Sequence, residues 1–355
     1  MCKRENRREF VRQIIGMGAG VYFSPFLAAM GLEGSVTDKT SSPKRLASPL
    51  IGLVDLSMPP RSRVILARDD KLLGENSKVN GSLLNKILAD ALMKLTLTGT
   101  PEKAWQSLFK PNDVVGIKLN CLAGKQLSPH VELVECLIGG LKLAGVQERN
   151  IIVWERFSRE LDACGFQTNM IGDGVKCYGT DELHGGGYDE HPEIAGSVGS
   201  CFSRIISSIC TAIINVPVLK DHDLAGVTLA MKNFFGAIHN PNKYHDNNCD
   251  PYIAELNTHS YIRRKQRLIV CDALVAQYNG GPAYKPQWAW NFSGLLISTD
   301  PVALDCVGAN IIEQKREKIR IPSLKQAGRE PKYIQTAASL GLGANDLSQI
   351  DVIEV

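Results

Sequence analysis

The chain has 355 residues, 44% of them hydrophobic, and a formal net charge of +3. Five of the 40 basic and two of the 37 acidic residues lie within positions 1–31, so the rest of the chain is neutral, with 35 of each sign. A neutral body of this size can form a large core and lacks the basic excess of a protein that binds nucleic acid or an anionic membrane surface. We therefore expect no nucleic-acid partner.

Residues 1–31 resemble a twin-arginine export signal. The pair Arg7-Arg8 precedes an apolar residue, a mildly hydrophobic stretch runs from 14 to 29, and small residues at 29–31 are suitable for cleavage. The alternative is a membrane anchor, but 16 residues interrupted by glycines and a proline are too short for a comfortable span. We expect a signal peptide recognised by the twin-arginine export machinery, and a periplasmic or otherwise exported protein without a stable membrane span.

Residues 32–59 are predicted to form a linker or loosely attached arm, because positions 32–49 are rich in Ser, Thr, Pro and Lys. No second linker and no internal repeat follows, so residues 60–355 are expected to form a single domain. Residues 172–199 contain three consecutive glycines and many acidic residues but no clear periodicity. We expect a long loop excursion there, either a lid or a plain surface loop.

Strand-like and helix-like segments alternate along this domain. The predicted strands are 63–67, 113–120, 150–154, 209–216, 267–273, 294–298 and 350–355. The predicted helices are 80–98, 128–144 with Ser128 as its cap, 158–164, 224–238, 250–259, 301–315 and 331–340. This alternation predicts an α/β fold with a largely parallel sheet flanked by helices.

Ligands of such sheets bind beyond the carboxyl ends of the strands. The uncharged stretch 205–219 ends abruptly in the polar cluster 220–223, as a buried strand does when it enters a loop. Asn120, Asp272 and Asp300 also follow predicted strands. Polar side chains are thus expected to collect at one edge of the sheet.

Three lysines stand alone in otherwise apolar segments: Lys118, Lys220 and Lys232. Helical spacing over 224–238 would place Lys232 and His239 about 20° apart on one face of a buried helix. The alternative for Lys232 is that its methylenes lie along apolar surface while its ammonium reaches water. Three such lysines favour a shared cationic site.

Cysteines and histidines give weaker signals. Nine cysteines remain after position 31 and none forms a C-x-x-C pair, so no ferredoxin-type cluster is expected. Cys177, Cys201 and Cys249 are the loop-like ones that could pair after export. The histidines show no short metal-ligand spacing, so no metal ligands are assigned; a divalent metal remains a minor alternative, and the cofactor is unknown.

Several segments carry a family resemblance. DVVGIKLN stands at 113–120, VPVLKDH at 216–222, GVTLAMKNFFG at 226–236, GGP at 280–282 after Asp272, and DPVALD at 300–305. These segments resemble motifs of the domain of unknown function 362 family, over roughly residues 60–315. The resemblance implies a site where the motifs meet, but no settled reaction. Members that resemble iron–sulfur proteins carry an appended cysteine-rich segment, which this chain lacks.

We favour an exported enzyme that acts on a small anionic or carbonyl-bearing substrate, with the reaction class left open. His222 would exchange a proton near its ordinary pKa of about 6.5, or a desolvated lysine would form a Schiff base. The alternatives are a small-anion binding protein without catalysis, and an interaction or assembly factor with an exposed Phe234/Phe235 face. The candidate residues are His222, Lys232 and Lys220 (catalytic), Lys118, Asn120, Asn233 and His239 (substrate-binding), and Asp221 and Asp223 (orienting His222).

Overall fold

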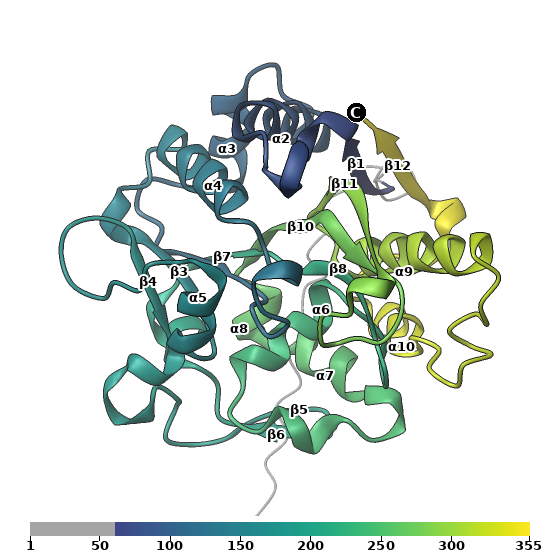
Figure 1. The fold of residues 1–355 in the computed structure, drawn as a ribbon. Coiled ribbons are helices and arrows are strands. Elements are labelled where there is room, and N and C mark those ends of the chain that lie inside the picture. The colour runs from purple at the N-terminus through teal and green to yellow at the C-terminus, as the bar shows by residue number, and fades with distance from the viewer. Residues whose placement is uncertain (1–60) are drawn as a thin grey trace, which may run out of the picture. The chain divides into compact units, whose positions relative to one another are not determined.

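A twisted sheet of ten strands forms the centre of the protein, whose computed structural model describes residues 61–355 (Figure 1). The predicted export signal (1–31) and linker (32–59) lie outside the described residues. The sheet strands are β1 (Ser62–Arg68), β2 (Val115–Lys118), β3 (Ile151–Glu155), β4 (Lys176–Gly179), β7 (Ala212–Asn215), β8 (Val218–His222), β9 (Gly226–Thr228), β10 (Gln266–Gln277), β11 (Ala289–Ser298) and β12 (Ile350–Glu354).

The strand order is β12-β1-β11-β10-β7-β2-β3-β4, and β8 joins beside β10 with β9 at its outer side. The strands from β10 through β7, β2 and β3 to β4 are all parallel, and so are the pairs β8–β10 and β1–β12. Only β11 and β9 run against their neighbours. The predicted α/β fold with a largely parallel sheet is therefore confirmed.

Helices cover both faces of the sheet (Figure 1). Successive strand residues point to opposite faces, so Ile213 packs in one core cluster and Ile214 in the other. One face is covered by α2 (Gly81–Thr96), α3 (Pro101–Leu108), α4 (Val131–Leu143) and α5 (Ser158–Cys164). The other is covered by α6 (Ala230–Asn233), α7 (Tyr252–Thr258), α8 (Ser260–Arg263), α9 (Pro301–Lys318) and α10 (Tyr333–Ser339). None of the helices in residues 61–355 is both long and apolar enough to cross a membrane.

The predicted helix over 224–238 is wrong. Its first residues form β9, which pairs with β8 as a hairpin, and only α6 and a 3₁₀ turn at Phe234–Ala237 follow. Gly226 has φ +80°, which lies outside the right-handed helical region, so a helix cannot pass through it. A Cβ there would lie 2.3 Å from the carbonyl oxygen of Arg329, so the position requires glycine. The wheel that placed Lys232 beside His239 therefore does not apply.

Three smaller differences concern boundaries. Residues 205–209 form a π-helical turn, so the strand within 205–219 begins only at Ala212. The excursion 172–199 includes β4, which pairs with β3, and β5 (Glu193–Ala195), which pairs with β6 (Val198–Ser200). Helix α4 begins at Val131 after His130, and the hydroxyl of Ser128 donates instead to the Gly124 carbonyl.

Two carboxylates of the 300–305 segment fix helix starts. Asp300 accepts hydrogen bonds from the amides of Val302 and Ala303 and caps α9. Asp305, fully buried, accepts from the amides of Ala230 and Met231 and thereby holds the start of α6. Burial raises the pKa of Asp305 to about 7, although these hydrogen bonds oppose the shift. This contact positions the helix that carries Lys232.

Candidate functional site: a cationic cavity at the strand ends

A cavity of about 290 Å³ lies at the carboxyl ends of β2, β3 and β8. Because these strands run in the same direction, their last side chains meet at one edge of the sheet. Lys118, Lys220, His222 and Lys232 all line this cavity, together with Asn120 and Asn233. The structure therefore brings the three isolated lysines of the sequence into one place.

Lys118 is neutralised within the cavity wall. Its buried ammonium lies 2.8 Å from Oε1 of Glu155, the last residue of β3, and 2.6 Å from the Leu119 carbonyl oxygen. The other carboxylate oxygen of Glu155 accepts the amide of Cys121 at 3.2 Å. A Cβ on Gly236 would lie 2.8 Å from the Lys118 Nζ and 2.9 Å from Oε1 of Glu155, so a larger residue there would displace this pair. Lys118 and Glu155 form a closed ion pair that shapes the site.

Lys220 has only an amide partner. Its fully buried ammonium donates to Oδ1 of Asn120 at 2.8 Å. The Asn120 amide group in turn donates to Oδ1 of Asn233 at 3.1 Å, and Asn233 donates to Asn215 at 2.8 Å. This chain of amides fixes the orientation of Asn120, so that its carbonyl oxygen faces the ammonium.

Lys232 has an imidazole partner. Its Nζ lies 3.2 Å from Nε2 of His245 and 4.4 Å from the centre of the Phe235 ring. The other ring nitrogen of His245 is 3.0 Å from the Pro241 carbonyl oxygen, which can only accept, so that nitrogen carries the proton. His245 therefore presents an unprotonated Nε2 to the lysine. Lys232 is 6% exposed, so its ammonium does not simply reach out to water.

Lys220 and Lys232 are buried cations of the cavity that lack a carboxylate partner in the described chain, while Arg156 and Glu160, which also line it, are only half-buried. Within residues 61–355, neither ammonium has a carboxylate oxygen within 4.0 Å. Burial lowers the pKa of each lysine to about 8, although the more distant charges of Glu155 (on Lys220) and Asp223 (on Lys232) oppose the shift. A site that holds two desolvated ammonium groups without a counter-charge is suited to an anion.

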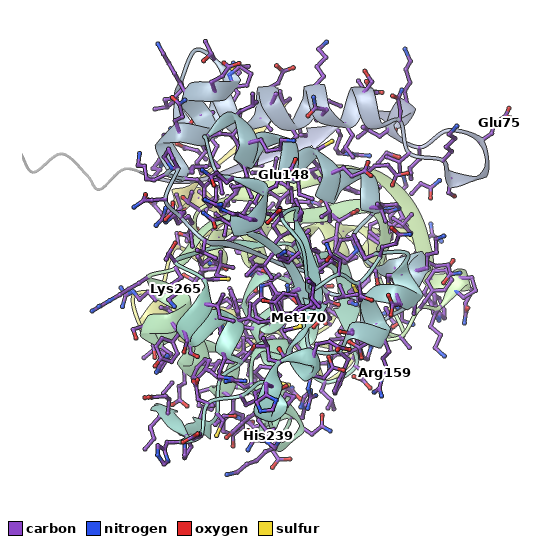
Figure 2. The ribbon with its side chains drawn as sticks, turned by 90° about the vertical axis from the view of Figure 1, so that its left-hand side faces the viewer. Glu75, Glu148, Arg159, Met170, His239 and Lys265 are labelled. Carbon is purple, nitrogen blue, oxygen red and sulfur yellow. The ribbon has the colours of Figure 1, made fainter. Side chains whose placement is uncertain are left out.

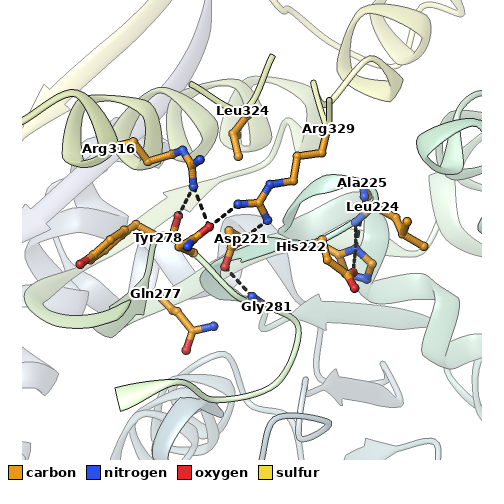
Figure 3. Close-up of polar contacts among 12 residues, drawn as sticks. Asp221, His222, Leu224, Ala225, Gln277, Tyr278, Gly281, Arg316, Leu324 and Arg329 are labelled. Atoms are coloured by element: carbon orange, nitrogen blue, oxygen red, sulfur yellow. Dashed lines mark hydrogen bonds and ion pairs between the residues drawn. The ribbon is translucent and has the colours of Figure 1, made fainter. Parts of the chain in front are cut away.

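His222 is held neutral. Its Nδ1 accepts the amide hydrogens of Leu224 at 3.1 Å and Ala225 at 3.2 Å, so the proton lies on Nε2 (Figure 3). Burial, followed by the charges of Lys232 and its neighbours, lowers the pKa of His222 to about 2. Proton exchange near pH 6.5 is therefore not supported, and His222 is instead a fixed hydrogen-bond donor at Nε2.

Of the two aspartates predicted to orient His222, Asp221 faces away from it and Asp223 lies beside it but is exposed. Asp221 points to the opposite side of β8, where it pairs with Arg329 at 2.6 Å and accepts the Gly281 amide at 2.9 Å (Figure 3). Asp223 approaches His222 Nδ1 at 3.2 Å, but its side chain is 63% exposed and that nitrogen already accepts two amides. The backbone, not a carboxylate, orients the imidazole.

His239 lies outside the cavity. It is exposed, its ring packs edge-on against Tyr188, and its amide donates to the Cys201 carbonyl (Figure 2). His245 occupies the place beside Lys232 that the helical wheel gave to His239. No local pattern in the sequence predicts that His245 lies beside Lys232, because its position depends on the turn that follows α6.

Several lining residues were not predicted from the sequence, among them Glu155, Thr228, Arg156 and Glu160. Glu155 directly follows a predicted strand, so the strand-end rule could have found it. Thr228 faces the cavity from β9, opposite Lys220 in the hairpin, and its buried hydroxyl has no hydrogen-bond partner within the described residues. A buried hydroxyl without a partner beside two ammonium groups is a further donor that a ligand could use.

Metal and cysteine chemistry gain no geometric support. In residues 61–355, no group of three or more His, Cys, Asp or Glu side chains is placed to hold a metal ion. All nine cysteines of this range are free thiols. Cys177 and Cys249, predicted to lie in loops, are buried in β4 and beside α7.

The fold and the cavity define an α/β protein with a lysine-lined cavity at the strand ends of a largely parallel sheet. The chain belongs to the family described as Domain of unknown function (DUF362), whose sequence profile matches residues 115–310. This range contains all the cavity residues named above. A comparison with curated proteins found no match.

Proposed function

We propose that the protein is an enzyme that binds a small organic anion in the cationic cavity and acts on a carbonyl group of that anion. One observation carries the proposal: Lys220 and Lys232 line one cavity as buried ammonium groups without a carboxylate partner in the described chain. Burying such charges costs free energy, and a bound anion would offset that cost. The volume of about 290 Å³ fits a metabolite of a few carbon atoms.

The two lysines are suited to different parts of such a substrate. Lys220, fixed by Asn120, and the Nε2–H of His222 are donors for a carboxylate. Lys232 has a pKa of about 8, so a useful fraction is an unprotonated amine at neutral pH. Its nitrogen would attack the carbonyl carbon, water would leave, and an imine would form. His245 Nε2, 3.2 Å away, would accept the proton that the lysine loses and pass it on, since burial and the charge of Lys232 lower the pKa of this ring.

The test uses mass spectrometry on the purified protein. Native spectra would first detect any small molecule that copurifies. The protein would then be incubated with pyruvate, a 2-oxo acid, and sodium borohydride, which reduces an imine to a stable secondary amine. We expect a covalent mass gain on the peptide that contains Lys232, lost in Lys232→Met and retained in the control Lys243→Met, whose lysine is exposed. Binding of pyruvate without any adduct would reject the imine step and favour a binding protein.

An assembly factor receives less support than either anion-site function. That alternative requires an exposed aromatic face on the α6 segment, but Phe234 is 0% and Phe235 5% exposed. A binding protein without catalysis uses the same cavity, so the adduct experiment separates it from the enzyme.

We also propose export through the twin-arginine route, on the strength of the sequence pattern at residues 1–31. Replacing Arg7 and Arg8 by Lys should retain the precursor in the cytoplasm, as measured by cell fractionation and immunoblotting. Unchanged delivery of the double variant outside the inner membrane would reject this route.

A further inference from the structure

A second cavity, of about 510 Å³, lies beside α4 and the loop between β10 and β11. Its lining includes Lys125, His130, Tyr284 and Trp290, none of which lines the cationic cavity. The loop is braced, because Gln277 donates to the Ala283 carbonyl and accepts the Lys285 amide. The wall that this loop forms is therefore held in place by hydrogen bonds.

A buried carboxylate fixes one imidazole in this wall. Asp272 is 1% exposed, and its Oδ2 accepts both the amide and the Nδ1 of His130 at 2.8 Å. Its Oδ1 accepts the Leu274 amide at 3.0 Å. Nδ1 of His130 is thus the protonated donor to Asp272, and Nε2 points away from the carboxylate without a hydrogen-bond partner in residues 61–355. Asp272 is a positioning residue, since it reaches the cavity only through His130.

The charged groups that line this cavity are basic, while the carboxylates of Asp272 and Glu132 act on His130 from outside the lining. Burial alone would lower the pKa of His130, but the charge of Asp272 and the hydrogen bond to it outweigh burial, so the pKa is raised above its ordinary value. At pH 6 the ring is therefore mainly an imidazolium, with a second proton on Nε2. Lys125 adds a further positive charge, and none of the residues that line the cavity is acidic. An acidic ligand group would find donors here and no repulsive neighbour in the lining.

We propose that the second cavity is a binding site for a small aromatic carboxylate, whose carboxylate contacts Nε2–H of His130 and whose ring lies against Tyr284 and Trp290. The two aromatic side chains supply flat apolar surface for a ring. The imidazolium supplies a directed, charged donor for the acid group. This site is independent of the cationic cavity and of the reaction proposed for it.

The test uses benzoate as the probe, with benzamide as an uncharged control of the same shape. The protein would be labelled with 5-fluorotryptophan and observed by ¹⁹F NMR at pH 6, with the four tryptophan resonances assigned through Trp→Phe variants. Trp290 reports on the second cavity. Trp154, whose ring lies 5.3 Å from the Lys118 ammonium, reports on the cationic cavity. We expect benzoate to shift the Trp290 resonance saturably, with Trp154 unmoved and benzamide at least tenfold weaker.

Variants locate the charged contact. His130→Gln should weaken benzoate at least fivefold, while His184→Gln, which changes an exposed histidine, should leave it unchanged. Asp272→Asn should lower the pKa of His130, followed by ¹H–¹³C NMR of the ring, and weaken benzoate in the same direction. The proposal is overturned if benzoate moves Trp154 and not Trp290, if benzamide binds as tightly, or if no resonance moves. The comparison of the two ligands uses wild-type protein and does not depend on folding of the variants.

Discussion

The two faces of β8 bury charge in opposite ways. On one face, Asp221 is closed off by Arg329, and the same guanidinium also reaches Asn279 (Figure 3). On the other face, Lys220 points into a cavity with only the amide oxygen of Asn120 beside it. One strand therefore presents a satisfied ion pair and an uncompensated ammonium only one residue apart.

This difference separates a structural charge from a candidate functional one. A closed pair such as Asp221–Arg329 fixes neighbouring loops, since Asp221 also accepts the Gly281 amide and a Cβ on Gly281 would lie 2.0 Å from the Asp221 carbonyl oxygen. An ammonium without a counter-charge lowers stability and is retained where a ligand uses it. Each face of β8 should thus respond differently to loss of its charge.

The largest effect is expected on the closed face. Arg329→Met leaves the Asp221 carboxylate buried without its cation, which should lower the free energy of unfolding by about 3–5 kcal/mol. Urea denaturation at pH 7 measures this change. Lys325→Met is the matched control, because its exposed pair with Glu330 should contribute less than about 1 kcal/mol. A loss below about 1 kcal/mol for Arg329→Met would show that Asp221 does not depend on Arg329 to remain buried.

On the open face the charge should matter for binding and not for folding. Lys220→Met and Lys232→Met remove a desolvated ammonium but keep most of the stem, so the free energy of unfolding should hold or rise. Affinity for the anionic ligand should fall by about 2–5 kcal/mol, measured by calorimetry with pyruvate or with the copurified molecule. If either variant melts and binds like the wild type, that lysine is only a core element.

The cavity lysines could be predicted from the sequence better than the ion pair between Asp221 and Arg329. Lys118 ends β2, as the strand-end rule predicted. Lys220 was expected in a loop after the strand 209–216 but lies within a separate strand, β8, which still brings it to the same cavity. The partner of Asp221 lies 108 residues away in the chain, and no local pattern reveals it. A closed ion pair of this kind depends on tertiary contacts alone.

The prediction of a helix over 224–238 failed for a related reason. The apolar residues of this segment have helical spacing, but Gly226 turns the chain and β9 pairs with β8, which is a contact between segments. Lys232 does line the same cavity as Lys118 and Lys220. The residue beside it is His245, from the turn that follows α6, and not His239. Periodicity identified the buried face but could not show where the helix starts.

The pH dependence of stability should sharpen the comparison. The folded pKa of Lys220 and of Lys232 is about 8, below the ordinary 10.5, so between these values the unfolded chain binds more protons. The free energy of unfolding therefore rises with pH, because raising the pH removes protons from the unfolded chain that the folded chain has already lost. The rise is roughly 3 kcal/mol per lysine between pH 8 and 10.5.

The measurement is the difference between wild type and Lys220→Met. Below pH 8 the variant should be the more stable protein, and the gap should close as pH approaches 10, because the wild-type lysine is then neutral as well. Urea midpoints at pH 7, 8, 9 and 10 test this trend. Anion affinity of the wild type should fall over the same range. A gap that stays constant with pH would mean that Lys220 is not desolvated.

The smallest effect is expected at His239, which the sequence pattern placed in the site. Its ring is exposed and packs on Tyr188, so His239→Gln should change both the free energy of unfolding and the anion affinity by about 0.5 kcal/mol or less. His245→Gln is the contrasting variant, because it removes the imidazole 3.2 Å from Lys232 and should weaken the anion. Calorimetry on both variants decides whether His239, as the helical wheel predicted, or His245, as the structure indicates, contributes to anion binding. Equal losses at the two positions would return His239 to the site and require this loop to lie differently around the cavity.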